Sequence, residues 1–379
     1  YKSSVIVSRE ESGARAFLAS KLFKSCPRTI LAVFSDQKKA LGFMDALKFF
    51  LPQHLSDILY FPGYHIQPFK SLSYHRETST SRLSILSKVM EGAPLFIVTH
   101  MDTLLQQMIP KAGINDFSEL VMANEETERE TLLARLEAGG YIRTTLVEDP
   151  GEYSVRGGIL DLFSPDQDKP VRLEFFGDLV ESIRQFSPYT QRGTRELAET
   201  VIVPATEAVI HQSDLPHILA RLRQAGSLAG IGPSAVREYV NTIREKGRFP
   251  GLESMLSIVY ENLDSFFDYI PENSLLLLDS LDLLESCARD FEARALLNYT
   301  SVTSENRLCV NPESIYLTWE QAWQKMSGLN HACFKMLELE EDKNKARVFH
   351  FHTRSNQNLS GQLGSFSDRE FPLKPLVDW

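Results

Sequence analysis

Paired cysteines, long apolar runs and an excess of basic charge are all missing from this sequence of 379 residues. The most apolar stretch, Ser274–Leu284, is interrupted by Asp279 and Asp282 and is too short to span a membrane. The N-terminus also lacks the apolar segment of a signal peptide. No CxxC pair occurs, which argues against a disulfide framework or a zinc site and for reduced structural thiols in a cytoplasmic protein. The thiols are Cys26, Cys287, Cys309 and Cys333.

The formal net charge is −10, whereas a protein that binds duplex DNA over its whole surface normally has a basic excess. The charge therefore favours a protein partner, although a local basic patch is not excluded. An autonomous DNA-binding protein is one alternative, which a salt-dependent shift of duplex DNA would support. Residue 1 is a tyrosine, so we expect the numbering to start inside a longer natural chain.

The length predicts two or more domains. Short apolar strands alternate with amphipathic helices in the first part of the chain, which indicates an α/β domain with a parallel sheet. Strands then follow in quick succession, as in a small α+β unit with an antiparallel sheet, before the helical pattern returns. We therefore predict an α/β domain formed by residues 1–115 and 201–320, an inserted domain at 116–200, and a polar tail at 321–379.

An intact phosphate-binding loop is missing from the first strand–loop–helix, Ser8–Phe23. Such a loop reads GxxxxGK[ST], in which the lysine contacts phosphate and the hydroxyl holds Mg²⁺. Here Ser8 replaces the first glycine and only Gly13 fits, because Ala14 and Arg15 stand at the lysine and hydroxyl positions. We prefer a structural strand–helix turn to the alternative, a working triphosphate site.

The acidic half of an ATPase site is incomplete as well. The apolar run SLLLLD ends at Asp279, but Ser280 stands where an ATPase has the glutamate that activates water. An aspartate after an apolar run most often caps the next helix, here the helix from Leu281. Since both halves lack their functional residues, we expect no catalytic residue, no metal site and no cofactor in this chain.

The block Glu152–Arg192 reads EYSVRGGILDLFSPDQDKPVRLEFFGDLVESIRQFSPYTQR. It resembles the inserted domain shared by the bacterial transcription-repair coupling factors (Mfd) and the excision-repair helicase UvrB. The flanking stretches 61–110 and 251–279 are similar to the first lobe of the coupling factors, so the resemblance covers about Val5–Glu320. It implies the UvrB-like N-terminal region of that family, with a degenerate RecA-like (P-loop NTPase-type) domain interrupted by the inserted domain.

Departures from UvrB favour the coupling factors. UvrB keeps an intact phosphate loop and a DESH box, where this chain has SREESGAR and DSLD. The segment Phe61–Arg82 is also too short for the aromatic hairpin that UvrB inserts into DNA. An ATP-dependent helicase subunit like UvrB is the alternative hypothesis, which micromolar ATP affinity in calorimetry would support.

In the coupling factors the inserted domain binds UvrA, and the resemblance carries that role to Arg156, Arg172 and Phe176. It further implies a longer parent protein in the bacterial cytoplasm, an ATP-dependent DNA translocase whose later domains hold ATP and Mg²⁺ and bind RNA polymerase and duplex DNA. An intramolecular contact with the parent's C-terminal region would restrain that motor.

The strand VRLEFF gives independent support, because alternate residues of a strand share a face. If Val171, Leu173 and Phe175 pack on the core, Phe176 is left in solvent beside Arg172. If both faces are covered, Phe176 is a core residue instead. We predict that Arg172→Ala or Phe176→Ala abolishes UvrA pull-down and leaves the melting temperature nearly unchanged.

Other candidate residues carry weaker signals. Arg184 and Arg192 lie in the same block and either extend the patch or stabilise turns. Glu253 reads as a helix or turn contact. His350 and His352 have the spacing of a strand-borne metal pair, but without a third ligand a solvent-facing edge strand is the preferred interpretation.

Overall fold

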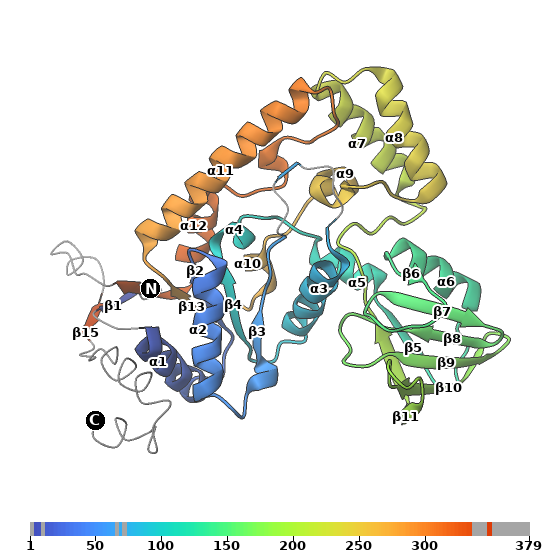
Figure 1. Ribbon diagram of the computed structural model, residues 1–379, viewed down its shortest axis with the longest axis horizontal. Helices are drawn as coiled ribbons and strands as arrows, with labels where there is room; N and C mark the ends of the chain where they lie inside the picture. Colours follow the sequence, from blue (N-terminus) through green and yellow to red (C-terminus); the bar gives the residue numbers. More distant parts are fainter. Residues whose placement is uncertain (1–3, 9–11, 65–67, 70–73, 336–346, 351–379) are drawn as a thin grey trace, which may run out of the picture.

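The computed structural model describes residues 4–8, 12–64, 68–69, 74–335 and 347–350. Its main sheet is parallel throughout and has the strand order β15-β1-β14-β13-β2-β4-β3 (Figure 1). The strands are β1 (Ser4–Ser8), β2 (Ile30–Phe34), β3 (Ile58–Tyr60), β4 (Phe96–His100), β13 (Leu275–Leu278), β14 (Asn330–Lys335) and β15 (Arg347–His350). The predicted α/β class is confirmed.

Both faces of the main sheet are buried, as expected for parallel strands. Alternate residues of β2 enter two separate apolar clusters: Ile30, Ala32 and Phe34 in one, Leu31 and Val33 in the other. The first cluster is closed by α1 (Ser12–Ser25) and α2 (Gln37–Phe50). The second is closed by α3 (Arg76–Met90), α4 (Met101–Leu104), α10 (Phe266–Tyr269), α11 (Leu281–Ser304) and α12 (Trp319–Ser327).

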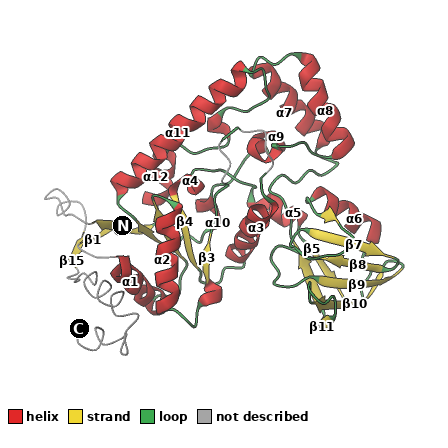
Figure 2. Ribbon diagram, in the orientation of Figure 1, coloured by secondary structure: helices red, strands yellow, loops and turns green. Residues whose placement is uncertain are grey.

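The inserted domain is a six-stranded sheet with the order β11-β10-β9-β8-β7-β6, flanked by a ribbon of β5 and β12. Figure 2 shows these strands gathered apart from the helix-rich remainder. All neighbours are antiparallel except β6 and β7. The strands are β5 (Glu119–Met122), β6 (Ile142–Arg143), β7 (Glu152–Arg156), β8 (Ile159–Leu162), β9 (Val171–Phe176), β10 (Leu179–Phe186), β11 (Gly193–Leu197) and β12 (Glu199–Ile202).

Short helices connect the two domains. α5 (Lys111–Phe117) and α6 (Arg129–Ala138) lead into the inserted sheet, and α7 (Leu215–Leu228), α8 (Pro233–Lys246) and α9 (Leu256–Val259) lead back to the main sheet. One apolar cluster runs continuously from Leu31 in the main sheet through Leu86 of α3 to Leu173 in the inserted sheet. The two domains are therefore packed against each other rather than joined by a flexible linker.

Part of the predicted tail belongs to the main sheet. β14 pairs with both β1 and β13 in its middle, and β15 is its edge next to β1. The apolar core of β14, Ala332–Phe334, is only three residues long and stands between polar residues. Pattern reading missed it because its partners are about 50 and 330 residues away in the sequence. The other predicted domain boundaries stay predictions.

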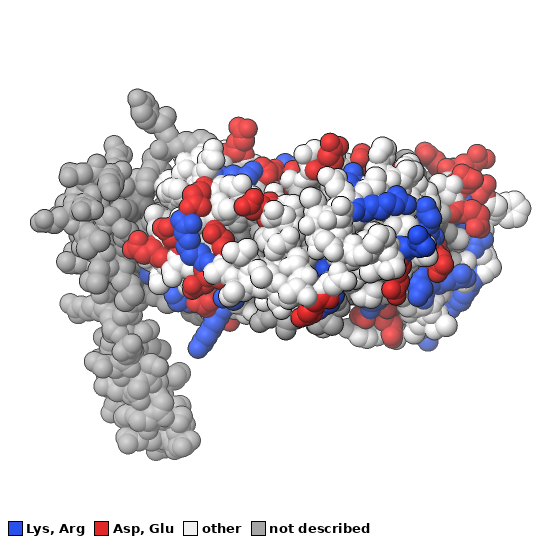
Figure 3. Space-filling model, turned by 90° about the horizontal axis from the view of Figure 1, so that it is seen from above, with Lys and Arg blue, Asp and Glu red and all other residues white. Residues whose placement is uncertain are grey.

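The surface has mixed charge where it can be seen from above: Figure 3 shows acidic and basic side chains interspersed on that face. Of the helices in the described ranges, none has both the length and the apolar character needed to cross a bilayer.

Candidate functional site

The strand β9 divides its side chains between two faces as the alternation predicted. Val171, Leu173 and Phe175 are buried, whereas the Phe176 side chain is 75% exposed. The alternative that made Phe176 a core residue is therefore wrong. A large aromatic side chain that a rigid strand holds in solvent is a typical anchor for a protein partner.

Beside this strand, two arginines share one buried carboxylate. Arg172 donates from Nε and Nη2 to the two oxygens of Asp161, at 2.6 and 2.9 Å. Arg156 donates from Nη2 to Asp161 Oδ2 at 2.5 Å. The Asp161 side chain is only 1% exposed, while those of Arg172 and Arg156 are 22% and 49% exposed. Two guanidinium groups thus share one buried carboxylate, and the Arg156 side chain remains about half exposed to solvent.

The hydrogen bonds from Arg172 to Asp161 also raise the pKa of the Arg172 guanidinium. That guanidinium lies 5.0 Å from the ring centre of Phe186, so a cation–π contact also holds it in place. Arg172 is therefore a rigid, permanently charged group rather than a mobile surface side chain.

The local sequence VRGG explains how Arg156 reaches this cluster. Gly157 has a φ of +59°, a left-handed conformation that strains residues with a side chain. A Cβ atom on Gly158 would lie 2.6 Å from the carbonyl oxygen of Phe175, so no larger residue fits there. This tight turn pairs β7 with β8 so that Asp161 stands opposite Ser154, one diagonal position from Arg156.

The weaker candidates of the block lie nearby. Arg184 stands directly opposite Arg172, and its charge is compensated by Glu196 at 3.3 Å and Glu174 at 3.9 Å. Arg192 lies in the loop after β10, where its carbonyl accepts a hydrogen bond from the N–H of Ser187 at 3.0 Å. Arg184 is thus on the same face of the sheet as Arg172, whereas the Arg192 backbone closes a turn.

The degenerate nucleotide position is occupied by an internal ion pair. Arg15 Nη1 lies 2.8 Å from Oδ1 of Asp279, and Lys39 Nζ lies 3.6 Å from its Oδ2. Asp279 is 4% exposed, so its charge is neutralised by protein groups inside the fold. The expectation that Asp279 caps α11 is wrong: Ser280 occupies the N-cap position, and the carboxylate turns to Arg15 instead.

Of the residues expected at the degenerate phosphate loop, Ser8, Gly13 and Ala14 lie in described elements. Ser8 is the last residue of β1, in register with Lys335 and His350. Gly13 and Ala14 already lie in the first turn of α1. A Cβ atom on Gly13 would meet no described protein atom within 4 Å, so packing within the described part of the fold does not require a glycine there.

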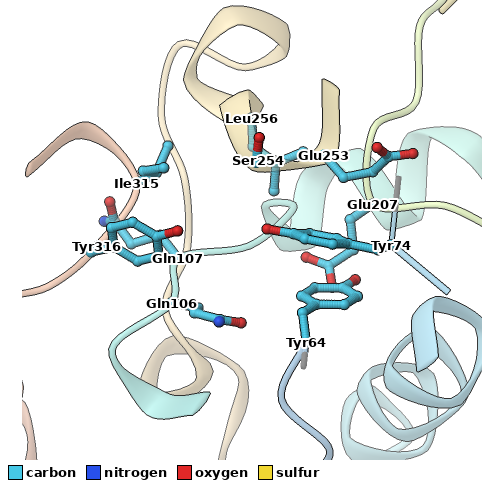
Figure 4. Close-up of a pocket in the computed structure, with 10 residues that line it drawn as sticks. All are labelled: Tyr64, Tyr74, Gln106, Gln107, Glu207, Glu253, Ser254, Leu256, Ile315 and Tyr316. Carbon is cyan, nitrogen blue, oxygen red and sulfur yellow. The ribbon is translucent and has the colours of Figure 1, made fainter. Parts of the chain in front are cut away.

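Buried polar groups meet where the two domains join. Arg82 Nε and Glu207 Oε1 lie 2.6 Å apart, with 0% and 1% of their side chains exposed. The Arg82 guanidinium stands 4.5 Å from the rings of both Phe61 and Tyr64. Figure 4 shows the adjoining cavity, where Tyr64 and Tyr74 are stacked beside Glu207 and Glu253.

That cavity has a volume of about 10 Å³, room for about one water molecule and far less than a nucleotide needs. Glu253 lies in a short 3₁₀ helix, Leu252–Met255, in keeping with a helix or turn contact, and burial raises the pKa of its carboxyl group. The structural role of Arg82, Glu207 and Glu253 depends on long-range contacts that no local motif indicated.

The metal hypothesis gains no support. Among the residues with described positions, no three His, Cys, Asp or Glu side chains are grouped so that they could hold a metal ion. His350 ends the edge strand β15, and His352 lies outside the described residues. Cys309 and Cys333 are buried, and Cys26 and Cys287 are half-buried.

Asp161 is the main site residue that the sequence reading overlooked. It stands in ILDLF, where two leucines and an isoleucine surround it, and a charged residue inside an apolar strand needs a partner. That signal could have paired it with Arg172, which faces it across the sheet.

Comparison with known proteins agrees with this geometry. Residues 121–207 match a family model described as the UvrB interaction domain. The chain is 28% identical over 381 residues to the transcription-repair-coupling factor of Myxococcus xanthus, covering 97% of this chain and 31% of that protein. It is 25% identical over 318 residues to that of Escherichia coli K12, covering 83% and 27%, and 28% identical over 243 residues to that of Bacillus subtilis, covering 61% and 21%.

These matches confirm the resemblance to the transcription-repair coupling factors, and the chain spans less than a third of the length of these relatives. The matched family block contains Arg156, Asp161, Arg172 and Phe176.

Proposed function

We propose that this chain is the UvrB-like N-terminal module of a transcription-repair coupling factor, and that it binds UvrA through the outer face of its inserted sheet. The observation that carries the proposal is the position of Phe176, which the strand β9 holds 75% exposed on the same face as Arg172. Arginines and large aromatics contribute most of the energy in many protein interfaces. Both side chains lie in the block that matches the UvrB interaction domain.

The module itself is catalytically silent in this proposal. Triphosphate binding needs a cation at the loop and a metal-binding acid at the strand end. In this chain Ala14 supplies no cation, and Asp279 already pairs with Arg15 and Lys39. A nucleotide would have to break that ion pair before Mg²⁺ could bind Asp279.

The parent protein would carry the remaining activities. In this proposal it releases stalled RNA polymerase by ATP-dependent translocation on duplex DNA, with ATP and Mg²⁺ bound in later domains. The module recruits UvrA to the stalled complex, and contact with the parent's C-terminal region restrains the motor until polymerase is engaged. A longer parent is supported by the length of the three relatives, because this chain covers 31% or less of each of them.

Isothermal titration of purified UvrA into this chain tests the partner. We expect saturable binding by the wild type and loss of at least tenfold in affinity for Phe176→Ala. Leu120→Ala is the matched control, because Leu120 is also an exposed apolar strand residue (52% exposed) but lies on the β5–β12 ribbon. Equal binding by wild type and Phe176→Ala, or no binding by the wild type, would refute the proposal.

Titration with ATP and Mg²⁺ separates this function from the helicase alternative. A silent module binds ATP at millimolar affinity or not at all, whereas a UvrB-like motor binds it at micromolar affinity. Micromolar binding that disappears in Asp279→Ala would favour the helicase.

A further inference from the structure

The hairpin of β9 and β10 contains a β-bulge that places a second apolar side chain on the outer face. In the register of the two strands, Ser182 pairs with Glu174, but Val180 pairs with Phe175. Phe175 and Glu174 are neighbours on β9, whereas their partners Val180 and Ser182 have one residue between them on β10. Glu181 is therefore the extra residue of the bulge.

The bulge reverses the in–out alternation of β10. Ile183 faces the core (1% exposed), so unbroken alternation would send Leu179 inward and Val180 outward. The extra residue shifts the phase by one. Val180 is consequently buried at 0% exposure, and the Leu179 side chain lies outward at 37% exposure.

Leu179 stands directly opposite Phe176, so the two form an apolar cross-strand pair at the end of the hairpin. Together with the Arg172–Arg156 cluster they make one continuous outer surface, since Arg172, Glu174 and Phe176 alternate along the same face of β9.

Hydrogen bonds with the segment before α6 fix this end of the hairpin. The N–H of Thr127 donates to Asp178 O at 2.8 Å, and the N–H of Arg129 donates to Asp178 Oδ1 at 3.1 Å. The N–H of Val180 donates to Glu125 O at 3.0 Å. The two apolar side chains are thus held outward by fixed backbone contacts, which lowers the entropy that a partner must remove on binding.

We propose that the bulge at Glu181 completes the partner site by presenting Leu179 with Phe176 as one apolar contact, and that UvrA buries both side chains. This inference rests on the proposed function and names the chemistry of its partner surface. The UvrA segment places an apolar side chain over the Phe176–Leu179 pair and a carboxylate beside the arginines. A carboxylate suits this position because Arg156, which shares Asp161 with Arg172, keeps 49% of its side chain exposed.

Calorimetric titration of UvrA into the whole chain tests the inference with Leu179→Ala. We expect the dissociation constant to rise about tenfold, because Leu179 and Phe176 would be buried together in one apolar contact. Leu120→Ala should bind within about twofold of the wild type. The melting temperature of both variants should match the wild type, because both leucines are partly exposed.

The double variant Phe176→Ala/Leu179→Ala provides a second measurement. If both side chains enter one contact, Leu179→Ala weakens binding much less in the Phe176→Ala background than in the wild type. The effects of the two substitutions on the binding free energy are then not additive. Wild-type affinity in Leu179→Ala would overturn the inference while leaving UvrA binding itself intact. Absence of binding by the wild type would instead refute the proposed function, and the inference with it.

Discussion

Arg172 holds the carboxylate of Asp161 with two parallel hydrogen bonds, from Nε at 2.6 Å and from Nη2 at 2.9 Å. The two residues face each other across β8 and β9, and Asp161 is nearly inaccessible to solvent. Arg172 therefore neutralises a buried charge, and it also keeps part of its side chain exposed on the face where we propose that UvrA binds.

The first prediction separates these roles. We expect Phe176→Ala to lose UvrA binding at an unchanged melting temperature, because its side chain is 75% exposed and fills no space in the core. We expect Arg172→Ala to lose binding and also about 1–3 kcal/mol of folding stability, because Asp161 then keeps only Arg156. This revises the expectation from sequence that both variants keep the wild-type melting temperature. Thermal melts and pull-down of the two variants check it, and an unchanged melting temperature for Arg172→Ala would contradict it.

The second prediction concerns the ion pair where the domains join. Glu207→Gln should lower the free energy of unfolding by about 3–5 kcal/mol, since it leaves the fully buried Arg82 charge without its counterion. Urea denaturation measures the loss. As a control, Glu320→Gln removes one of the three carboxylates that pair with the exposed Arg289 and should change the unfolding midpoint little. Similar effects of the two substitutions would show that burial of the pair does not matter.

The third prediction follows from Glu152. Burial by itself raises the pKa of Glu152, but hydrogen bonds from the N–H groups of Glu148 and Asp149 and the ion pair with Arg76 lower it below its ordinary value of 4.5. A carboxyl group with a lowered pKa in the folded state stabilises the fold above pH 4.5, and this contribution is lost as the pH falls through the folded pKa.

Glu152→Gln should therefore reduce stability at neutral pH and make the stability less dependent on pH in the acid range. Urea unfolding at a series of pH values measures this. Glu148→Gln is the control, because Glu148 contributes its backbone N–H rather than its side chain. Parallel pH profiles for wild type and Glu152→Gln would disprove the assignment.

The fourth prediction concerns the former nucleotide position. Arg15→Ala should loosen α1, because among the described residues Asp279 then keeps only the ion pair with Lys39, at 3.6 Å. We expect faster amide hydrogen exchange in α1, and we expect ATP with Mg²⁺ not to restore protection. Lys21→Ala serves as the control on the same helix, since the Lys21 ammonium contacts the exposed Phe17 ring. Restored protection by ATP would mean that a nucleotide site remains.

Local sequence pattern located several of the strands of this protein. The alternation in VRLEFF assigned the inward and outward faces of β9, and the apolar runs located β2, β4 and β13, because side-chain periodicity reflects a backbone geometry that each segment adopts on its own. The absence of the phosphate-loop lysine and of the water-activating glutamate could also be recognised from sequence, since the residues that nucleotide chemistry needs occupy fixed positions relative to a strand and a helix.

Tertiary structure alone decided how distant residues meet. Arg15 and Asp279 are 264 positions apart in the sequence, and Arg82 and Glu207 are 125 apart, so no local window contains either pair. The same holds for β14, whose three apolar residues become a central strand only between β1 and β13. The outward position of Leu179 likewise depends on a bulge, which arises from the register of two strands rather than from the periodicity of one.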